Sequence, residues 1–311
     1  MKLKTIILSS IIICFSCKTD KKQPIENTEE VNKDETIEII TNAMEFITQD
    51  TIPSGWQTFR YINNSPEAHF ILFDKYPEGK TIADTRKDIF PPFDKGMELI
   101  IEGKMEEAMN AFGELPEWFS EIVFTGGSGL ISPNQLNTFT LKLDPGLYIL
   151  ECYVKMANGQ FHSSMGMVKE IHVTEESSDH QPPEAMMNVA ISSVNGIVIN
   201  DTIRKGEQTF KVLYEDQIVH ENFVGHDLNL ARLEDDADLN ALEAWMNWAN
   251  PTGLRTPAPA GVTFLGGTND APAGSVQYFT ANLTPGNYVL ISEVPDPSKK
   301  GMLKRFRITE K

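Results

Sequence analysis

The stretch FTLKLDPGLYILECYV, residues 139–154, decides the fold because a second version of it, FTANLTPGNYVLISEV, stands at residues 279–294. Both stretches alternate apolar and polar side chains around a Pro-Gly turn, a pattern typical of strands that bury one face. Other segments repeat as well: FTGG at 124–127 matches FLGG at 264–267, and ITQDTIPSGWQTFR at 47–60 matches VINDTIRKGEQTFK at 198–211. The two halves of the chain therefore share one fold.

Short alternating segments recur along both halves, separated by turn residues such as NNSPE and ANG. They predict an all-β protein of two tandem antiparallel Greek-key sandwiches. Residues 76–117 interrupt the pattern with the helix-like segment DKGMELIIEGKMEEAMNAFGEL, which predicts a short helical insertion in the first sandwich. An apolar stripe is expected on this insertion, formed by Met97, Leu99, Ile100, Met105, Met109 and Phe112.

The N-terminal segment MKLKTIILSSIIICFSC, residues 1–17, has two lysines followed by an apolar run that is too short to span a bilayer as a helix. This arrangement predicts a secretory signal peptide. A small residue, Ser16, directly precedes Cys17, and the segment resembles the lipobox of bacterial lipoproteins. The resemblance implies cleavage before Cys17, lipidation of that residue and anchorage to a membrane of the bacterial cell envelope. An uncleaved anchor helix is the alternative.

The chain has 311 residues and a formal net charge of -17, which becomes -19 when Lys2 and Lys4 leave with the signal peptide. An acidic surface repels nucleic acid and anionic lipid headgroups, so we expect cationic proteins or metal cations as neighbours. If Cys14 also leaves and Cys17 carries lipid, Cys152 is the one remaining thiol. No intramolecular disulfide can then form, and a lone thiol in an exported protein must be buried or ligated.

Two polar segments divide the chain, whose length by itself favours two domains. Residues 18–36 lack aromatic side chains and are expected to form a flexible tether. Residues 176–186 are rich in polar residues and proline, and are expected to form a linker. The predicted domains are therefore residues 37–175 and residues 187–311.

Three segments of the first half together resemble the cupredoxin family of blue-copper proteins: NNSPEAHFILFD (63–74), DPGLYILECYV (144–154) and GQFHSSMGMVKEI (159–171). The spacing Cys-x9-His-x4-Met is similar to that of type 1 copper sites in nitrite reductases. The resemblance implies one type 1 copper ion with the ligands His69, Cys152, His162 and Met167. A thiolate, two imidazoles and a weak thioether suit both Cu(I) and Cu(II), so little rearrangement accompanies electron transfer.

The second half serves as an internal control for these ligands. Ser292 stands where the first half has Cys152, and PDPSKKGM (295–302) is too short to hold a counterpart of His162. The fold therefore does not require Cys152 or His162, and their presence favours a function.

The evidence for the other two ligands is weaker. His226 and Met302 stand near the positions that correspond to His69 and Met167, so these two ligands can be structural instead. Met165 is an alternative candidate for the axial ligand.

No phosphate-binding loop, hydrolase triad or paired-carboxylate motif stands out, and a nitrite reductase needs histidines for a second copper site that the sequence lacks. We therefore expect no enzymatic activity. One function is a lipid-anchored envelope copper protein that carries single electrons or holds copper, with a redox or copper-delivery protein as its partner. The alternative is a metal-free interaction module whose Cys152 is buried and inert. A metal site requires both histidine nitrogens within roughly 4 Å of the Cys152 sulfur.

Overall fold

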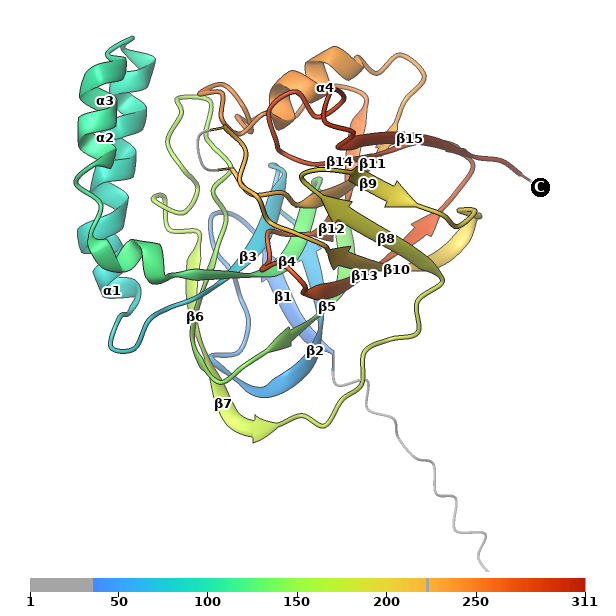
Figure 1. Cartoon of the computed structure of the whole chain (residues 1–311), viewed down its shortest axis with the longest axis horizontal. Helices are drawn as coiled ribbons and strands as arrows, with labels where there is room; N and C mark the ends of the chain where they lie inside the picture. The colour runs from blue at the N-terminus through green and yellow to red at the C-terminus, as the bar shows by residue number, and fades with distance from the viewer. Residues whose placement is uncertain (1–35, 222–223, 311) are drawn as a thin grey trace, which may run out of the picture. The chain divides into compact units, whose positions relative to one another are not determined.

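The computed structural model describes residues 36–221 and 224–310 (Figure 1). The predicted signal peptide, the lipidation site at Cys17 and the tether up to residue 35 lie outside the described residues. Within the described residues, no helix is both long enough and apolar enough to cross a membrane.

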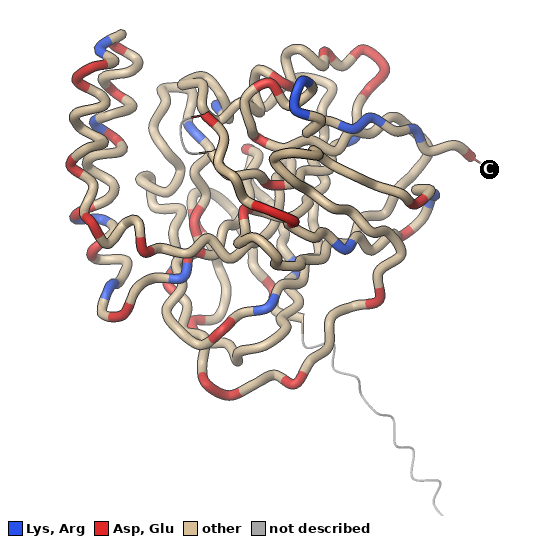
Figure 2. The backbone as a smooth tube through the Cα atoms, in the orientation of Figure 1, with Lys and Arg blue, Asp and Glu red and all other residues tan. Residues whose placement is uncertain are grey.

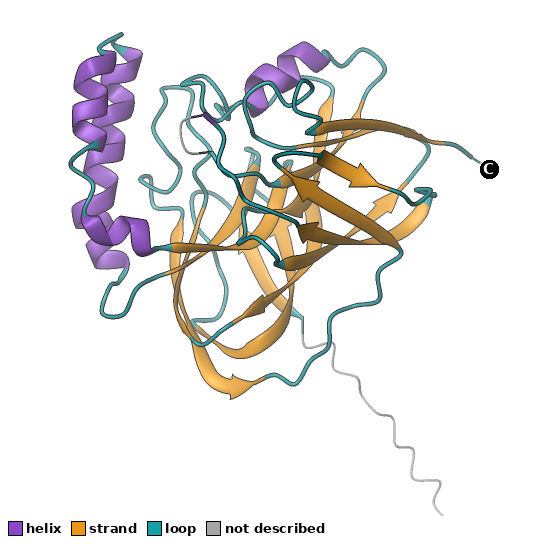
Figure 3. Ribbon diagram, in the orientation of Figure 1, coloured by secondary structure: helices purple, strands orange, loops and turns teal. Residues whose placement is uncertain are grey.

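The architecture is all-β, as the sequence predicts, and helices occur in insertions between strands (Figure 3). The first half contributes β1 (Ile37–Thr41), β2 (Thr51–Asn63), β3 (His69–Lys75), β4 (Val123–Ile131), β5 (Gln135–Leu143), β6 (Gly146–Glu151) and β7 (Val168–Ser177). The second half contributes β8 (Met187–Ser192), β9 (Gly196–Ile199), β10 (Gly206–Tyr214), β11 (Leu228–Leu233), β12 (Val262–Thr268), β13 (Val276–Leu283), β14 (Gly286–Ile291) and β15 (Leu303–Ile308). Residues 178–186, between β7 and β8, carry no helix or strand.

The strands form two hydrogen-bonded layers. One layer has the order β9-β8-β10-β13-β5-β2-β1, and the other has the order β15-β14-β11-β12-β4-β3-β6-β7. β2 belongs to both layers because its first residues pair with β7 and its later residues pair with β5. The change of partner falls at Gly55, whose φ of 94° lets the strand bend there. Pairing is antiparallel except between β1 and β2, β2 and β7, and β8 and β10, which differs from the wholly antiparallel expectation.

Both layers run from one half of the chain into the other, and equivalent residues meet at the two crossings. Phe139 of β5 pairs with Phe279 of β13, and Ser128 of β4 pairs with Thr268 of β12. Each pair is separated by the 140 positions that separate the repeats in sequence. A residue that contacts its own counterpart lies beside a two-fold axis. The two halves are therefore related by a pseudo-two-fold axis.

The core repeats with the same symmetry. Phe59 stacks on Phe139 in the first half, with ring centroids 5.1 Å apart. Their counterparts Phe210 and Phe279 stack at 4.6 Å in the second half. All four rings are buried and belong to one apolar cluster that extends through both halves.

The predicted helical insertion lies between β3 and β4, as α1 (Ile82–Asp84), a π-helical turn (Thr85–Ile89), α2 (Phe90–Ile101), α3 (Met105–Phe112) and a 3-10 turn (Glu117–Glu121). α2 and α3 form an antiparallel hairpin (Figure 1), and Gly103, with a φ of 79°, lies in the turn between them. Leu99 is buried against α3, but Met105 and Met109 are 55% and 57% exposed. These two methionines were wrongly assigned to the apolar stripe.

The second half has an insertion at the corresponding place, between β11 and β12. It contains α4 (Leu239–Met246), which the sequence analysis missed. The Asp238 carboxylate accepts hydrogen bonds from the backbone N–H groups of Asn240 and Ala241, so a standard N-cap starts this helix.

Candidate metal centre

Three elements of the first half bring one histidine, one cysteine and a second histidine together. His69 is the first residue of β3, and Cys152 directly follows the last residue of β6. β3 and β6 are antiparallel neighbours, so the start of β3 and the end of β6 lie at the same edge of the sheet. His162 reaches this edge from the loop between β6 and β7, which folds back on itself through a hydrogen bond from the His162 N–H to the Val154 carbonyl.

The three donor atoms converge. The Cys152 sulfur lies 3.7 Å from Nδ1 of His69 and 3.9 Å from Nδ1 of His162, and the two Nδ1 atoms are 3.1 Å apart. Both distances to sulfur meet the limit of roughly 4 Å expected for a shared metal. All three residues are fully buried. Within the described residues, this is the one group of three or more His, Cys, Asp or Glu side chains whose donor atoms lie close enough to hold a metal ion.

The size of the triangle matches a metal ion. The circle through three atoms with these separations has a radius of about 2.1 Å, close to the bond lengths of about 2.0 to 2.3 Å that imidazole nitrogen and thiolate sulfur make with zinc, an ion of similar size to copper. These three side chains would therefore be able to hold one metal ion together.

Burial keeps both imidazoles neutral. It lowers the pKa of His69 to about 3, with the positive charge of a protonated His162 adding to the effect, and lowers the pKa of His162 to about 4. Each ring therefore has a lone pair available at neutral pH. Burial also raises the pKa of the Cys152 thiol to about 12, although hydrogen bonds from the backbone of Phe70 and Val154 lower it. The thiolate therefore needs an adjacent cation in order to form.

Hydrogen bonds among the three side chains cannot satisfy all of their donor atoms, whereas a shared copper ion can. A neutral imidazole has a single N–H, so at most one proton can join the two facing Nδ1 atoms, and the Nε2 atoms of both rings are buried with no hydrogen-bond partner. A cation at the centre satisfies both Nδ1 atoms and the sulfur together. The donor set of two imidazoles and one thiolate, beside a methionine, is that of a single type 1 copper ion.

Met167 lies beside the cluster. It is fully buried, its carbonyl accepts a hydrogen bond from the Cys152 N–H at 3.4 Å, and its N–H donates to the His162 carbonyl at 3.0 Å. Met165 is 46% exposed, so it does not share this environment. Phe161, next to His162, is buried and contacts Phe93 of α2, with ring centroids 6.0 Å apart.

A polar network fixes the loop in front of His69. The Asn63 side chain donates to the carbonyls of Glu67 and Ile131 at 2.8 and 2.9 Å. Its side-chain oxygen accepts hydrogen bonds from the N–H and the hydroxyl of Ser65. Asn63 is fully buried and spans the loop, so it sets the point at which β3 and His69 begin.

The strand register confirms the correspondence of the second half. Leu72 pairs with Gly127 and Glu151, and its counterpart Asn229 pairs with Gly267 and Ile291. Three residues before each stands a histidine, which makes His226 the structural equivalent of His69.

The second half nevertheless builds a different site. The Ser292 hydroxyl, in the position of the Cys152 thiol, donates to the Asp227 carboxylate at 2.9 Å. Nδ1 of His226 lies 3.1 Å from the Ser193 hydroxyl. The Ser292 N–H donates to the Met302 carbonyl at 3.1 Å, as the Cys152 N–H does to Met167, so the methionine position has a structural role in both halves.

Three residues that are not among the predicted ligands join the two halves next to the cluster. The Tyr153 hydroxyl donates to Glu293 at 2.5 Å, and the ammonium group of Lys155 donates to the Gly253 carbonyl at 2.8 Å. Tyr153 and Glu293 are counterparts at the repeat offset of 140, which could have indicated a contact across a symmetry axis. Lys155 is 1% exposed, and no sequence pattern distinguishes it from a surface lysine.

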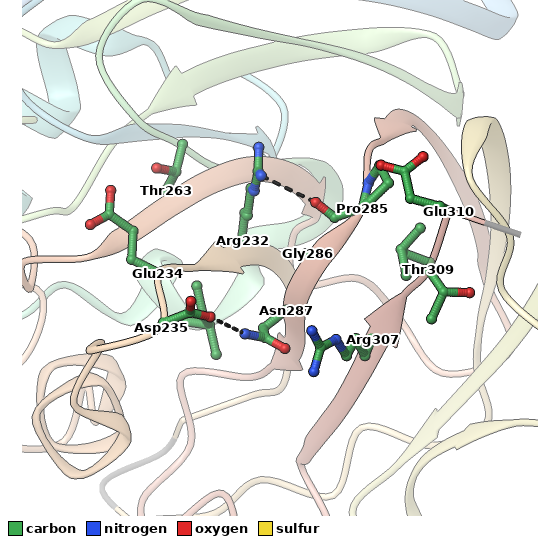
Figure 4. A pocket seen from close by; sticks show the side chains of 12 residues that line it. Arg232, Glu234, Asp235, Thr263, Pro285, Gly286, Asn287, Arg307, Thr309 and Glu310 are labelled. Atoms are coloured by element: carbon green, nitrogen blue, oxygen red, sulfur yellow. Dashed lines mark hydrogen bonds between the residues drawn. The ribbon is translucent and has the colours of Figure 1, made fainter.

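A surface groove of about 920 Å³ lies elsewhere, at the opposite end of β11 (Figure 4). Arg232 donates to the Pro285 carbonyl at 3.2 Å, and Asn287 donates to the Asp235 carboxylate at 3.0 Å. The residues that line it include no histidine or cysteine. It is therefore separate from the metal cluster.

Comparisons with known proteins gave structural matches only. No family profile and no curated protein sequence matches the chain. Among solved structures, dithionite-reduced auracyanin from Roseiflexus castenholzii is 21% identical over 45% of this chain and 97% of its own, with a TM-score of 0.27. Auracyanin A, a "blue" copper protein from Chloroflexus aurantiacus, is 20% identical over 45% of this chain and 98% of its own, also at 0.27. A copper-containing nitrite reductase from Thermus scotoductus is 12% identical over 88% of this chain and 61% of its own, at 0.23.

TM-scores this low do not establish a shared fold, so the fold has to be judged from the structure of this chain. Two facing layers of strands carry a buried His-Cys-His cluster at the edge where β3 begins and β6 ends. Both features are those that the resemblance of the sequence to cupredoxins implies.

Proposed function

We propose that this chain is a lipid-anchored copper protein of the bacterial cell envelope that carries single electrons through a type 1 copper site in its first half. The observation that supports the proposal is the convergence of two Nδ1 atoms and one sulfur within 3.9 Å of one another in a fully buried position. Because the donors already face a common point, either oxidation state of copper can bind with little movement of the protein.

The test uses the protein without residues 1–17. We expect it to bind about one Cu(II) per chain with an intense visible thiolate-to-copper band. Cys152→Ser should abolish this band, because serine cannot supply the thiolate. His162→Ala removes a second proposed ligand and should also weaken the band. Its matched control is His172→Ala, which should leave the band unchanged because the His172 side chain is 66% exposed on β7. A colourless protein loaded with copper contradicts the proposal.

Reversible redox chemistry separates an electron carrier from a copper store. A carrier should lose its band on reduction and regain it on reoxidation with the copper still bound. Release of copper on each reduction would favour storage or delivery instead. Absence of copper binding altogether would leave the metal-free interaction module as the function.

We propose a cationic redox protein as the partner. The α2–α3 hairpin lies beside the Cys152–His162 loop: Phe93 contacts Phe161, and the Ile101 side chain lies against Gly159. Residues 90–112, which form the hairpin, include five acidic residues and two lysines, whose positions along the backbone are coloured in Figure 2. Ile101 and Met165 are about half exposed, at 49% and 46%. An apolar surface with an acidic rim attracts and orients a basic protein.

A further inference from the structure

The loop that carries Cys152 and His162 is hydrogen-bonded to the second half of the chain at residues 153, 155 and 157. The Lys155 N–H donates to the Leu254 carbonyl, and the Lys155 carbonyl accepts from the Thr256 N–H, both at 2.8 Å. Two residues further on, the guanidinium of Arg255 donates to the Ala157 carbonyl. The loop therefore pairs with a segment that is about 100 residues away in the sequence.

Lys155 closes this pairing from inside. Its side chain is buried, its Nζ donates to the Gly253 carbonyl at 2.8 Å, and it lies 5.6 Å from the centre of the Trp248 ring. A buried ammonium group must be satisfied by acceptors, and here both the carbonyl and the ring face come from the second half. Removal of these acceptors would leave the loop with an unpaired buried cation.

Tyr153, next to the cysteine, is held in the same way. Its hydroxyl donates to the Glu293 carboxyl group at 2.5 Å, and its ring contacts that of Trp248 at 5.9 Å. The backbone N–H of Trp248 donates to the backbone carbonyl of Glu293 at 3.0 Å. Tyr153, Trp248 and Glu293 thus form a closed set of contacts directly behind Cys152.

Glu293 is itself held by Asp227, which also binds Ser292, the residue that stands in the position of Cys152. The Glu293 N–H and the Ser292 hydroxyl both donate to one oxygen of Asp227, at 2.8 and 2.9 Å. Ser292 occupies the position of Cys152. At the strand end where the first half has Cys152, the second half therefore has a hydrogen-bonded anchor.

We infer that the second half is a positioning element of the metal centre: Glu293 and residues 248–256 hold the 152–162 loop so that Cys152 and His162 face His69. Neither Glu293 nor the 248–256 segment touches the donor atoms, so they act through the loop. The inference deepens the proposed function and rests on it only for its copper measurements.

The test compares two substitutions at Glu293. Glu293→Ala removes the acceptor of the Tyr153 hydroxyl, whereas Glu293→Gln keeps a side-chain oxygen in place. Glu207→Gln, at an exposed glutamate of β10, is the matched control. Hydrogen exchange of the copper-free protein, measured by mass spectrometry over residues 153–163, should be at least about tenfold faster in Glu293→Ala than in the wild type. Glu293→Gln and Glu207→Gln should stay within about twofold.

The copper-loaded protein gives the second measurement. Glu293→Ala should still bind one copper but release it to a chelator about 10- to 100-fold faster, as is usual when residues that support metal ligands are removed. If the wild type binds no copper, the proposed function fails, while hydrogen exchange still decides whether the second half holds the loop.

An exchange rate and a copper release rate in Glu293→Ala that both equal those of Glu207→Gln would overturn the inference. If Glu293→Ala does not fold, as judged by circular dichroism, Tyr153→Phe and Lys155→Met replace it. Tyr153→Phe removes the hydrogen bond to Glu293 from the loop side, and Lys155→Met removes the hydrogen bond of the loop to the Gly253 carbonyl. The same thresholds apply to both variants.

Discussion

At the scale of single residues, two methionines two positions apart have opposite environments. Met167 is fully buried and bonded through its backbone to Cys152 and His162, whereas Met165 is 46% exposed. The axial ligand of a type 1 site is weak and tunes its reduction potential. We therefore expect Met167→Leu to retain one copper ion but to change the potential and the visible spectrum. Met165→Leu, measured by the same voltammetry and spectroscopy, should match the wild type, and the reverse result would make Met165 the axial ligand.

Most of the candidate metal cluster could be predicted from the sequence because its residues lie close together in the chain. Cys152, His162 and Met167 lie within one strand end and one loop, and the absent counterpart of Cys152 in the second half marked it as dispensable for the fold. Tyr153, Lys155 and Glu293 could not be identified in this way. Their roles depend on the relative placement of two distant segments, and the repeat alone does not determine that placement.

At the scale of elements, the α2–α3 hairpin shows where periodicity fails. Leu99 is 5% exposed and packs on Ala108 and Ala111, so these three residues form the seam between the helices. The spacing of Met105 and Met109 is also compatible with a buried stripe. After the turn at Gly103, however, α3 packs against α2 with the face that carries its alanines. Periodicity identifies that a helix has an apolar face, but the small residues decide which face can approach a neighbouring helix.

The two kinds of position should respond differently to truncation. We expect Leu99→Ala to lower the free energy of unfolding by about 2–4 kcal/mol, because it leaves a cavity in the seam of the hairpin. Met109→Ala should change it by less than about 0.5 kcal/mol, since the side chain is 57% exposed. Urea denaturation of the copper-free protein gives both values. Equal losses at the two positions would mean that α3 packs through its methionines.

At the scale of the whole molecule, buried carboxyl groups gather between the halves and should make stability depend on pH. Asp270 accepts a hydrogen bond from Gln217, and burial, together with the negative charge of Asp227, raises the pKa of Asp270 to about 8. An unfolded aspartate has a pKa near 3.9. Between pH 4 and pH 8 the folded state therefore binds more protons than the unfolded state, so the contribution of Asp270 to stability is lost as the pH rises through this window.

Asp270→Asn removes this titration with little change of shape. The free energy of unfolding of the copper-free protein should fall between pH 5 and pH 8 in the wild type, and should fall by at least about 1 kcal/mol less in Asp270→Asn. Chemical denaturation at both pH values measures the difference. An unchanged pH dependence in the variant would show that Asp270 is already ionised in the folded protein at pH 5.

The pairing of β5 with β13 and of β4 with β12 determines how the first half should behave alone. A protein of residues 36–177 exposes the edges of β4 and β5, which present unpaired backbone groups. Since each edge normally meets its own counterpart, a second copy of the first half can bind there. We expect this fragment to form dimers at micromolar concentration, as measured by sedimentation, and a stable monomer would contradict the expectation.

The meeting of Phe139 with Phe279, and of Ser128 with Thr268, makes this chain the equivalent of a homodimer whose subunits have been fused. Fusion gives the two copies a fixed ratio of one to one, and it lets them diverge because each is encoded separately. A symmetric dimer cannot substitute a thiol in one subunit and keep it in the other. Here the first copy has a buried His-Cys-His cluster, while the second copy, which has Ser292 in place of Cys152, is free to support it.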